Sequence, residues 1–147
     1  MRRQIAVLLL SISIAGAALA AEGSKSAREL RMDERREFVT GFAGEAQSSV
    51  RFSRFYDFEP LGTDTLLLYE SLNRAYLVKI EDFCPDMPTA FKLGVDNSSS
   101  SLNVRLDAIV VRGNRCRIID IRPVDVKAMK AAQKAKREAA KAAAKPA

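Results

Sequence analysis

The chain has 147 residues, and without its first 20 residues this length corresponds to one domain rather than two. It contains no histidine, which excludes Ser-His-Asp and Cys-His catalysis and removes the commonest ligand of zinc and copper. The net charge of +6 arises at the C-terminal end, because residues 21–125 hold 15 Lys and Arg against 17 Asp and Glu; specific nucleic-acid binding is therefore not expected.

Residues 1–20 have the pattern of a cleaved secretory signal peptide. Arg2 and Arg3 form a short basic region, an apolar run follows to Ala18, and Ala18-Leu19-Ala20 supplies the small residues that a signal peptidase requires. The apolar run is too short for a permanent membrane-spanning helix. We therefore expect a periplasmic or secreted protein, cleaved after Ala20.

An amphipathic helix is predicted near the start of the mature chain. Ser26 and Glu29 fit a capping box, and the helix is expected to continue to about Ala43, with Gly44 at C′. Phe38 and Phe42 are one turn apart and share the face that would lie on a sheet.

From Val50 the apolar period changes to two, which predicts antiparallel strands with short turns. The segment 65–69 is apolar on both faces and is expected at the centre of the sheet. The other expected strands cover residues 50–58, 75–80, 89–95, 103–111 and 115–121, with a hairpin turn at Gly113-Asn114. The expected inward faces are Val50, Phe52, Tyr56 and Phe58 in the first strand and Val104, Leu106, Ala108 and Val110 in the strand over 103–111. The predicted class is α+β, mainly β: a five- or six-stranded antiparallel meander forming a half-barrel or small barrel, with the N-terminal helix covering an open face.

Residues 126–147 form a Lys/Ala-rich tail, predicted to be a helix that is capped by Asp125 and projects from the domain. Its seven cations are Lys127, Lys130, Lys134, Lys136, Arg137, Lys141 and Lys145. Such a tail can dock on an anionic polymer or membrane surface, although the composition favours a solvated, solubilising extension.

Cys84 and Cys116 are the two cysteines of the chain. In an exported protein such a pair predicts a disulfide, and residues 21–125 then form a single globular domain tied by this bond. Free thiols or a redox dithiol are the alternative, which the absence of C-x-x-C spacing makes less favoured.

Charged residues flank both cysteines and neighbouring positions: Asp86, Arg105, Asp107, Arg117, Arg122 and Asp125. The disulfide would bring Asp86 close to Arg117. This cluster is either a site for a small charged ligand or a set of structural salt bridges, and the pattern favours salt bridges. No catalytic residue, metal ligand or cofactor is expected.

Four motifs in this order resemble a known family: Cys84-Pro85-Asp86, Arg105-Leu106-Asp107, Cys116-Arg117-Ile118 and Ile121-Arg122-Pro123-Val124-Asp125. The chain resembles the small exported proteobacterial proteins grouped as domain of unknown function 6491. The resemblance covers residues 48–125, and the tail is interpreted as an addition to the family pattern. It implies a periplasmic or cell-surface location and a conserved disulfide, and it brings no activity.

These observations predict an uncharacterised exported envelope protein, a non-enzymatic binding or accessory module whose partner is an unknown envelope component. One alternative is a secreted inhibitor of a lytic enzyme, presenting the loop 71–74 or 97–101 to an active site. The other is a hydrolase that uses carboxylates alone. It requires a concave pocket with two carboxylates, one of which has a raised pKa.

Overall fold

The computed structural model describes residues 25–81, 84–97 and 99–144, so the signal-peptide prediction falls outside the described residues. The helices are α1 (Ala27–Thr40), the short 3-10 helix η1 (Met87–Thr89) and α2 (Val126–Ala143). The strands are β1 (Ser49–Arg51), β2 (Asp57–Pro60), β3 (Thr65–Ser71), β4 (Arg74–Ile80), β5 (Gly94–Asp96), β6 (Ser101–Asn103), β7 (Ala108–Val111) and β8 (Asn114–Val124).

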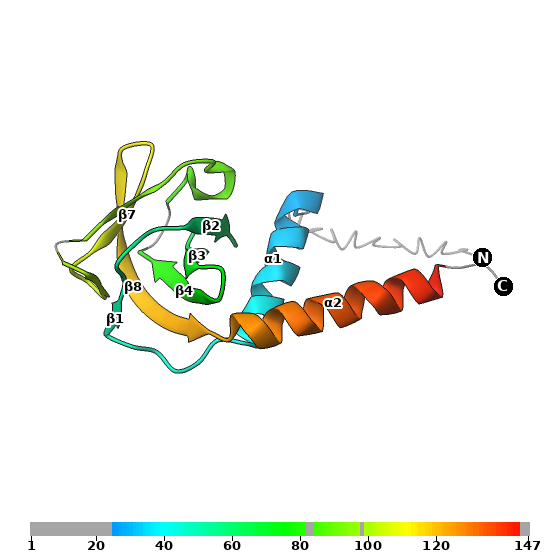
Figure 1. Cartoon of the computed structure of the whole chain (residues 1–147). Helices are drawn as coiled ribbons and strands as arrows, with labels where there is room; N and C mark the ends of the chain where they lie inside the picture. The colour runs from blue at the N-terminus through cyan, green and yellow to red at the C-terminus, as the bar shows by residue number, and fades with distance from the viewer. Residues whose placement is uncertain (1–24, 82–83, 98, 145–147) are drawn as a thin grey trace, which may run out of the picture.

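Six strands form one antiparallel sheet in the order β2-β3-β4-β8-β7-β5, and β1 pairs with β6 in a separate two-stranded ribbon. The large sheet curls into a half-barrel, with both helices beside one end of it (Figure 1). The long strand β8 pairs with β7 through its first residues and with β4 through its later ones. The predicted mainly-β half-barrel with an N-terminal and a C-terminal helix is confirmed.

Alternation along β3 buries side chains on both faces of the sheet. Leu66 and Leu68 belong to the core inside the half-barrel, whereas Leu67 belongs to a second core on the outer face. There, α1 contributes Val39 and the first turn of α2 contributes Met129, which are 0% and 1% exposed. This two-sided burial explains the continuous apolar run and confirms the central position predicted for residues 65–69.

The predicted capping box of α1 is present, because Ser26 and Glu29 exchange hydrogen bonds between side chain and backbone. The helix ends earlier than predicted, at Thr40, with Gly41 as its C-cap. Gly44 has another role: its N–H donates to the carbonyl of Pro123 at 2.8 Å, and a Cβ at this position would lie 3.3 Å from Pro123 Cγ. Close packing against Pro123, rather than a helix end, favours a glycine here, because a Cβ would force the proline ring to shift.

The strand predicted over residues 50–58 is two segments that serve two sheets. β1 belongs to the small ribbon, β2 is an edge of the large sheet, and residues 52–56 between them are irregular. Val50 and Phe52 are buried as predicted, but Tyr56 is 54% exposed. The prediction of one continuous buried face is therefore wrong.

The strand predicted over residues 103–111 is also interrupted, by a turn in which Arg105 has a φ of 69°. The turn shifts the alternation by one residue. Before the turn, Val104 packs against the inner core as predicted. Leu106, however, is 77% exposed and Ile109 lies in the core, which is the reverse of the faces predicted for these two residues.

A two-residue hairpin joins β7 to β8 one residue earlier than predicted. Val111 pairs with Asn114, so Arg112 and Gly113 form the turn, with φ values of 49° and 87°. Two positive φ values are typical of a type I′ turn, whose twist matches that of the flanking strands. The strand predicted over residues 89–95 is shorter than expected, since η1 occupies its beginning and β5 covers only Gly94–Asp96.

The C-terminal helix is capped by Asp125, as predicted: its Oδ1 accepts a hydrogen bond from the N–H of Ala128 at 2.9 Å. Val126 and Met129 are each 1% exposed and pack in the outer core. The first turn of α2 is therefore part of the globular domain, and the rest of the helix runs away from the sheet (Figure 1).

Candidate functional site

A disulfide joins Cys84, in the segment after β4, to Cys116 on β8. Both cysteines are buried in the core inside the half-barrel, at 1% and 8% exposure. The predicted bond is thus present. It fixes residues 84–96, which contain little regular structure, against the hairpin of β7 and β8.

The charged cluster predicted beside this disulfide does not form one site. Asp86 Oδ1 lies 3.3 Å from Arg112 Nη1, and Arg117 Nη1 lies 3.7 Å from Glu81 Oε1. The prediction that Asp86 and Arg117 face a shared region is wrong. The reason is the strand pleat: Cys116 points into the core, so the next side chain along the strand points to the outer face.

Two further members of the predicted cluster have separate structural roles. Arg122 Nε donates a hydrogen bond to Asp120 Oδ2 at 2.8 Å. Asp125 caps α2. Neither residue lines a cavity together with Asp86.

Arg105, Asp107 and Arg117 do come together, in a cavity of about 220 Å³. The other residues that line it are Glu81, Leu106, Ala108 and Arg115. Asp107 is 3% exposed, and one of its carboxylate oxygens accepts hydrogen bonds from Asn103 N at 2.7 Å and Asn103 Nδ2 at 2.9 Å. Its role is to hold the turn between β6 and β7, which presents Arg105 to the cavity.

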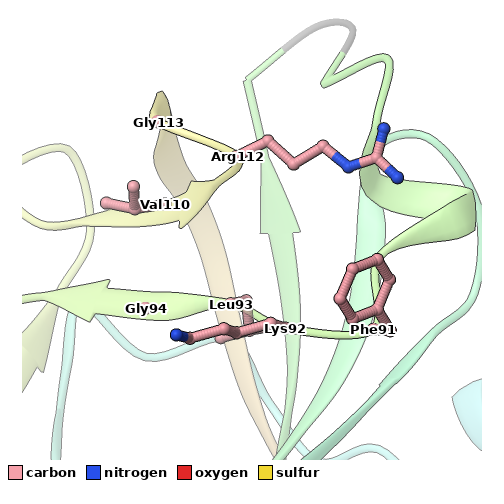
Figure 2. A pocket seen from close by; sticks show the side chains of 7 residues that line it. All are labelled: Phe91, Lys92, Leu93, Gly94, Val110, Arg112 and Gly113. Carbon is pink, nitrogen blue, oxygen red and sulfur yellow. The ribbon is translucent and has the colours of Figure 1, made fainter.

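A second cavity, of about 360 Å³, lies where the segment before β5 approaches the β7–β8 hairpin (Figure 2). It is lined by Phe91, Lys92, Leu93, Gly94, Val110, Arg112 and Gly113, and we call it the edge groove. Phe91 is 84% exposed, and the Arg112 guanidinium lies over its ring, 5.9 Å from the centroid. The groove therefore combines an apolar surface with an exposed aromatic ring and two cations.

The edge groove has a firm frame. The Gly94–Val110 pair belongs to the register of β5 and β7, and Val110 Cβ is 3.8 Å from the position that a Gly94 Cβ would occupy. Arg112 is held in the two-residue turn and contacts Asp86 beside the disulfide. The groove is thus built between segments that are tied covalently and by sheet pairing.

The edge groove is not predicted by the sequence pattern. The pattern places Phe91 in a regular strand over residues 89–95 and the hairpin turn at Gly113-Asn114, which leaves Arg112 in a strand. The only local signal for the true turn is Gly113 as its second residue, since a type I′ turn needs a positive φ at both central positions. The first position is held by Arg112, and a residue with a side chain seldom adopts a positive φ, so the signal is weak.

A buried carboxylate outside these cavities also has a defined role. Glu70, at the end of β3, is 4% exposed and accepts hydrogen bonds from the N–H and hydroxyl of Ser53 at 3.1 and 3.0 Å and from Arg74 at 3.1 Å. Burial raises the pKa of Glu70, but the hydrogen bonds from Ser53 and Arg74 outweigh it, and the net pKa is lowered. Glu70 thereby fixes the irregular segment after β1.

Two carboxylates share a cavity of about 340 Å³ at the start of α1. A hydrogen bond from the backbone of Ser26 lowers the pKa of Glu29, and a hydrogen bond from Lys25 lowers the pKa of Asp33. This pair lacks the raised pKa that the hydrolase alternative requires. Across residues 25–81, 84–97 and 99–144, no group of three His, Cys, Asp or Glu side chains is placed to hold a metal ion.

The described cations of the tail lie along α2 and are exposed, with Lys145 outside the described residues. Lys130 Nζ donates to the carbonyl of Leu72 at 2.7 Å, and Lys134 Nζ lies 3.9 Å from Glu138 Oε1. Lys136 lines a cavity of about 190 Å³ between α1 and α2. In the part of the chain that the structure describes, no helix is both long and apolar enough to cross a membrane.

The fold and its cavities define a small half-barrel domain that is tied by one disulfide and carries two cavities near its β7–β8 end. The chain belongs to the family of unknown function DUF6491, whose match covers residues 1–140. This match is wider than residues 48–125 and includes most of the tail, so the interpretation of the tail as an addition is wrong. A search of the curated proteins finds no match, and a search of the solved structures finds none either.

Proposed function

We propose that this protein is an exported, non-enzymatic binding module of the cell envelope and that its ligand enters the edge groove. The observation that carries the proposal is the Phe91 ring, which is 84% exposed at the rim of an apolar cavity. Covering an aromatic ring with a ligand removes apolar area from water, at roughly 25 cal/mol per Å². A rigid frame adds to this gain, because little order has to be created on binding.

The charge of the groove indicates the class of ligand. Lys92 and Arg112 are the charged residues of its lining, and both are cations. Arg112 also forms an ion pair with Asp86. Because the Arg112 side chain is 53% exposed, this ion pair is weak and leaves the guanidinium able to contact a ligand. The favoured ligand is an apolar group that carries a negative charge, with the apolar part against Phe91 and the charge near the Arg112 guanidinium, which lies on the Phe91 side of the groove (Figure 2).

Export is supported by two independent features. The first is the sequence pattern of residues 1–20, with its basic start, apolar run and small residues at the end. The second is the buried disulfide, since such bonds persist in oxidising compartments. Both features support a periplasmic or secreted location.

The tail supplies a second contact in this proposal. The exposed cations of α2 would attract an anionic polymer or membrane surface of the envelope, and those toward the C-terminal end of the helix, Arg137 and Lys141, lie farthest from the sheet. An attraction of this kind weakens steeply with salt, whereas the apolar contribution to binding in the groove does not. The tail thus holds the module near the ligand that the groove binds.

A tryptophan reporter tests the groove directly, because the chain contains no tryptophan. Phe91→Trp keeps an aromatic ring at the rim, and the purified protein is titrated with octanoate or with octylammonium, which has the same chain length and the opposite charge. We expect a saturable blue shift of the emission with octanoate and a much weaker one with octylammonium. The matched control is Phe55→Trp, since Phe55 is 41% exposed and packs 6.1 Å from Phe58, away from the groove.

The titration has two outcomes that would overturn the proposal. One is no saturable change for Phe91→Trp with either amphiphile. The other is an equal response from the Phe55→Trp control, which would indicate nonspecific adsorption.

A further inference from the structure

We propose that the cavity between Arg105, Arg115 and Arg117 binds a phosphate group. This site is separate from the edge groove, because the two cavities share no lining residue. The inference therefore stands or falls independently of the proposed function.

Sheet register brings the arginines together. Arg115 and Arg117 are two residues apart on β8, so their side chains lie on the same outer face of the sheet. Ala108 pairs with Arg117, and its small side chain leaves room between the arginines. Arg105 is placed beside them by its own N–H, which donates to the carbonyl of Ile118 at 2.7 Å.

The backbone conformation of Arg105 is strained. Its φ of 69° is in the left-handed region, which side chains other than those of glycine and asparagine seldom adopt. The buried carboxylate of Asp107 holds the turn through Asn103, and the N–H of Asp107 donates to the Asn103 carbonyl at 3.1 Å. A glycine would form this turn more easily, so the arginine at this position points to a use for its side chain.

The charges in the cavity leave room for an anion. Asp107 is buried and already bonded to Asn103. The Arg115–Asp96 and Arg117–Glu81 pairs are at 2.6 and 3.7 Å between side chains that are at least half exposed, and such pairs hold their partners weakly. Over the described residues, no carboxylate oxygen lies within 4 Å of a guanidinium nitrogen of Arg105.

Phosphate is the ligand that fits this set of groups. The planar guanidinium donates two parallel hydrogen bonds to a tetrahedral oxyanion, and several arginines together bind phosphate more strongly than lysines do. The cavity of about 220 Å³ has space for a phosphate with a small organic group. Leu106, 77% exposed at the rim, is placed to contact that organic group.

The test is a titration of the purified protein at constant ionic strength, with four probes: inorganic phosphate, glycerol 3-phosphate, phosphatidylglycerol vesicles and phosphatidylcholine vesicles. Arg105→Gln removes one charge in the cavity. Arg122→Gln removes the same charge from β8 at a position paired with Asp120, away from the cavity. Because both variants keep the whole tail, any vesicle binding by α2 is the same in both.

We expect Arg105→Gln to weaken binding about tenfold or more, and Arg122→Gln to change it less than twofold. Loss confined to the soluble probes would identify a free phosphate ester as the ligand; loss confined to phosphatidylglycerol vesicles would identify a lipid headgroup. The proposal is overturned when the wild type binds none of the phosphate probes, or when the two variants are equally affected in every arm. Thermal melts of both variants verify that they fold.

Discussion

Removing the disulfide gives the largest stability change that the structure predicts. The bond joins Cys84 to Cys116 across 32 residues, and closing a loop of this length stabilises the folded state by about 3.7 kcal/mol in the chain-entropy model. Both sulfurs are buried in the inner core, so replacing them with alanine methyl groups also leaves a small void, which adds about 1 kcal/mol. We expect Cys84→Ala/Cys116→Ala to lower the free energy of unfolding by roughly 4–5 kcal/mol.

Urea unfolding followed by circular dichroism measures this change. The slope of free energy against urea should also rise in the variant, because an unfolded chain without the crosslink exposes more surface. Cys84→Ala alone is the control, since it breaks the same bond and should lose nearly as much. A double variant within about 1 kcal/mol of the wild type would refute the reasoning that this bond fixes residues 84–96 on the sheet.

Three further predictions concern the frame around the cavities. Gly113→Ala should lower the free energy of unfolding by about 1 kcal/mol, because residue 113 has a φ of 87°. Gly41→Ala is the control and should be neutral or stabilising, because residue 41 has a φ of −62°. Equal effects of the two substitutions in urea unfolding would contradict this. Glu70→Gln should lower the free energy of unfolding by about 1–3 kcal/mol at pH 7, because it weakens the hydrogen bonds from Ser53 and Arg74. These hydrogen bonds lower the folded-state pKa of Glu70, so the stability they give is fully present above the unfolded pKa of 4.5 and is lost as the pH falls through the folded pKa. Unfolding measured from pH 3 to 7 should show the gap to the wild type closing at low pH, and a gap that is constant with pH would refute this assignment. Met129→Ala should cost about 2–4 kcal/mol because its side chain is 1% exposed, while Lys141→Ala should change stability by less than about 0.5 kcal/mol; a thermal melt of Met129→Ala that overlays the wild type would show that the first turn of α2 is not part of the domain.

The parts of the fold that the sequence predicted are those with strong local patterns. The capping box at Ser26 and the cap at Asp125 depend on neighbouring residues, and both are present. β3 is apolar at every position from Leu66 to Leu68 because helices cover the outer face of the sheet while the half-barrel encloses the inner one. A strand that is buried on both faces is recognised in the sequence as a continuous apolar run.

The parts that could not be predicted depend on irregular backbone. One left-handed residue, Arg105, reverses the alternation before β7, and no pattern in the surrounding residues distinguishes it from a strand position. The charged residues beside the disulfide are separated for a related reason. Cys116 and Arg117 are neighbours in sequence, yet the pleat directs them to opposite faces, and the disulfide brings backbones together without bringing the flanking side chains together.

The edge groove was beyond sequence reasoning because its two halves come from separate segments. Phe91 and Arg112 meet only through the pairing of β5 with β7 and the exact position of the hairpin turn. A hairpin shifted by one residue, as the sequence suggested, would have directed Arg112 elsewhere.

The central claim is that this half-barrel binds an anionic amphiphile in the edge groove. Its most direct test is a titration of the isotope-labelled protein with octanoate, followed by the amide resonances in two-dimensional NMR spectra. We predict saturable shift changes concentrated at residues 91–94 and 110–113, with the amides of α2 unmoved. Changes spread evenly over the sheet, changes confined to α2, or none at all would contradict the claim.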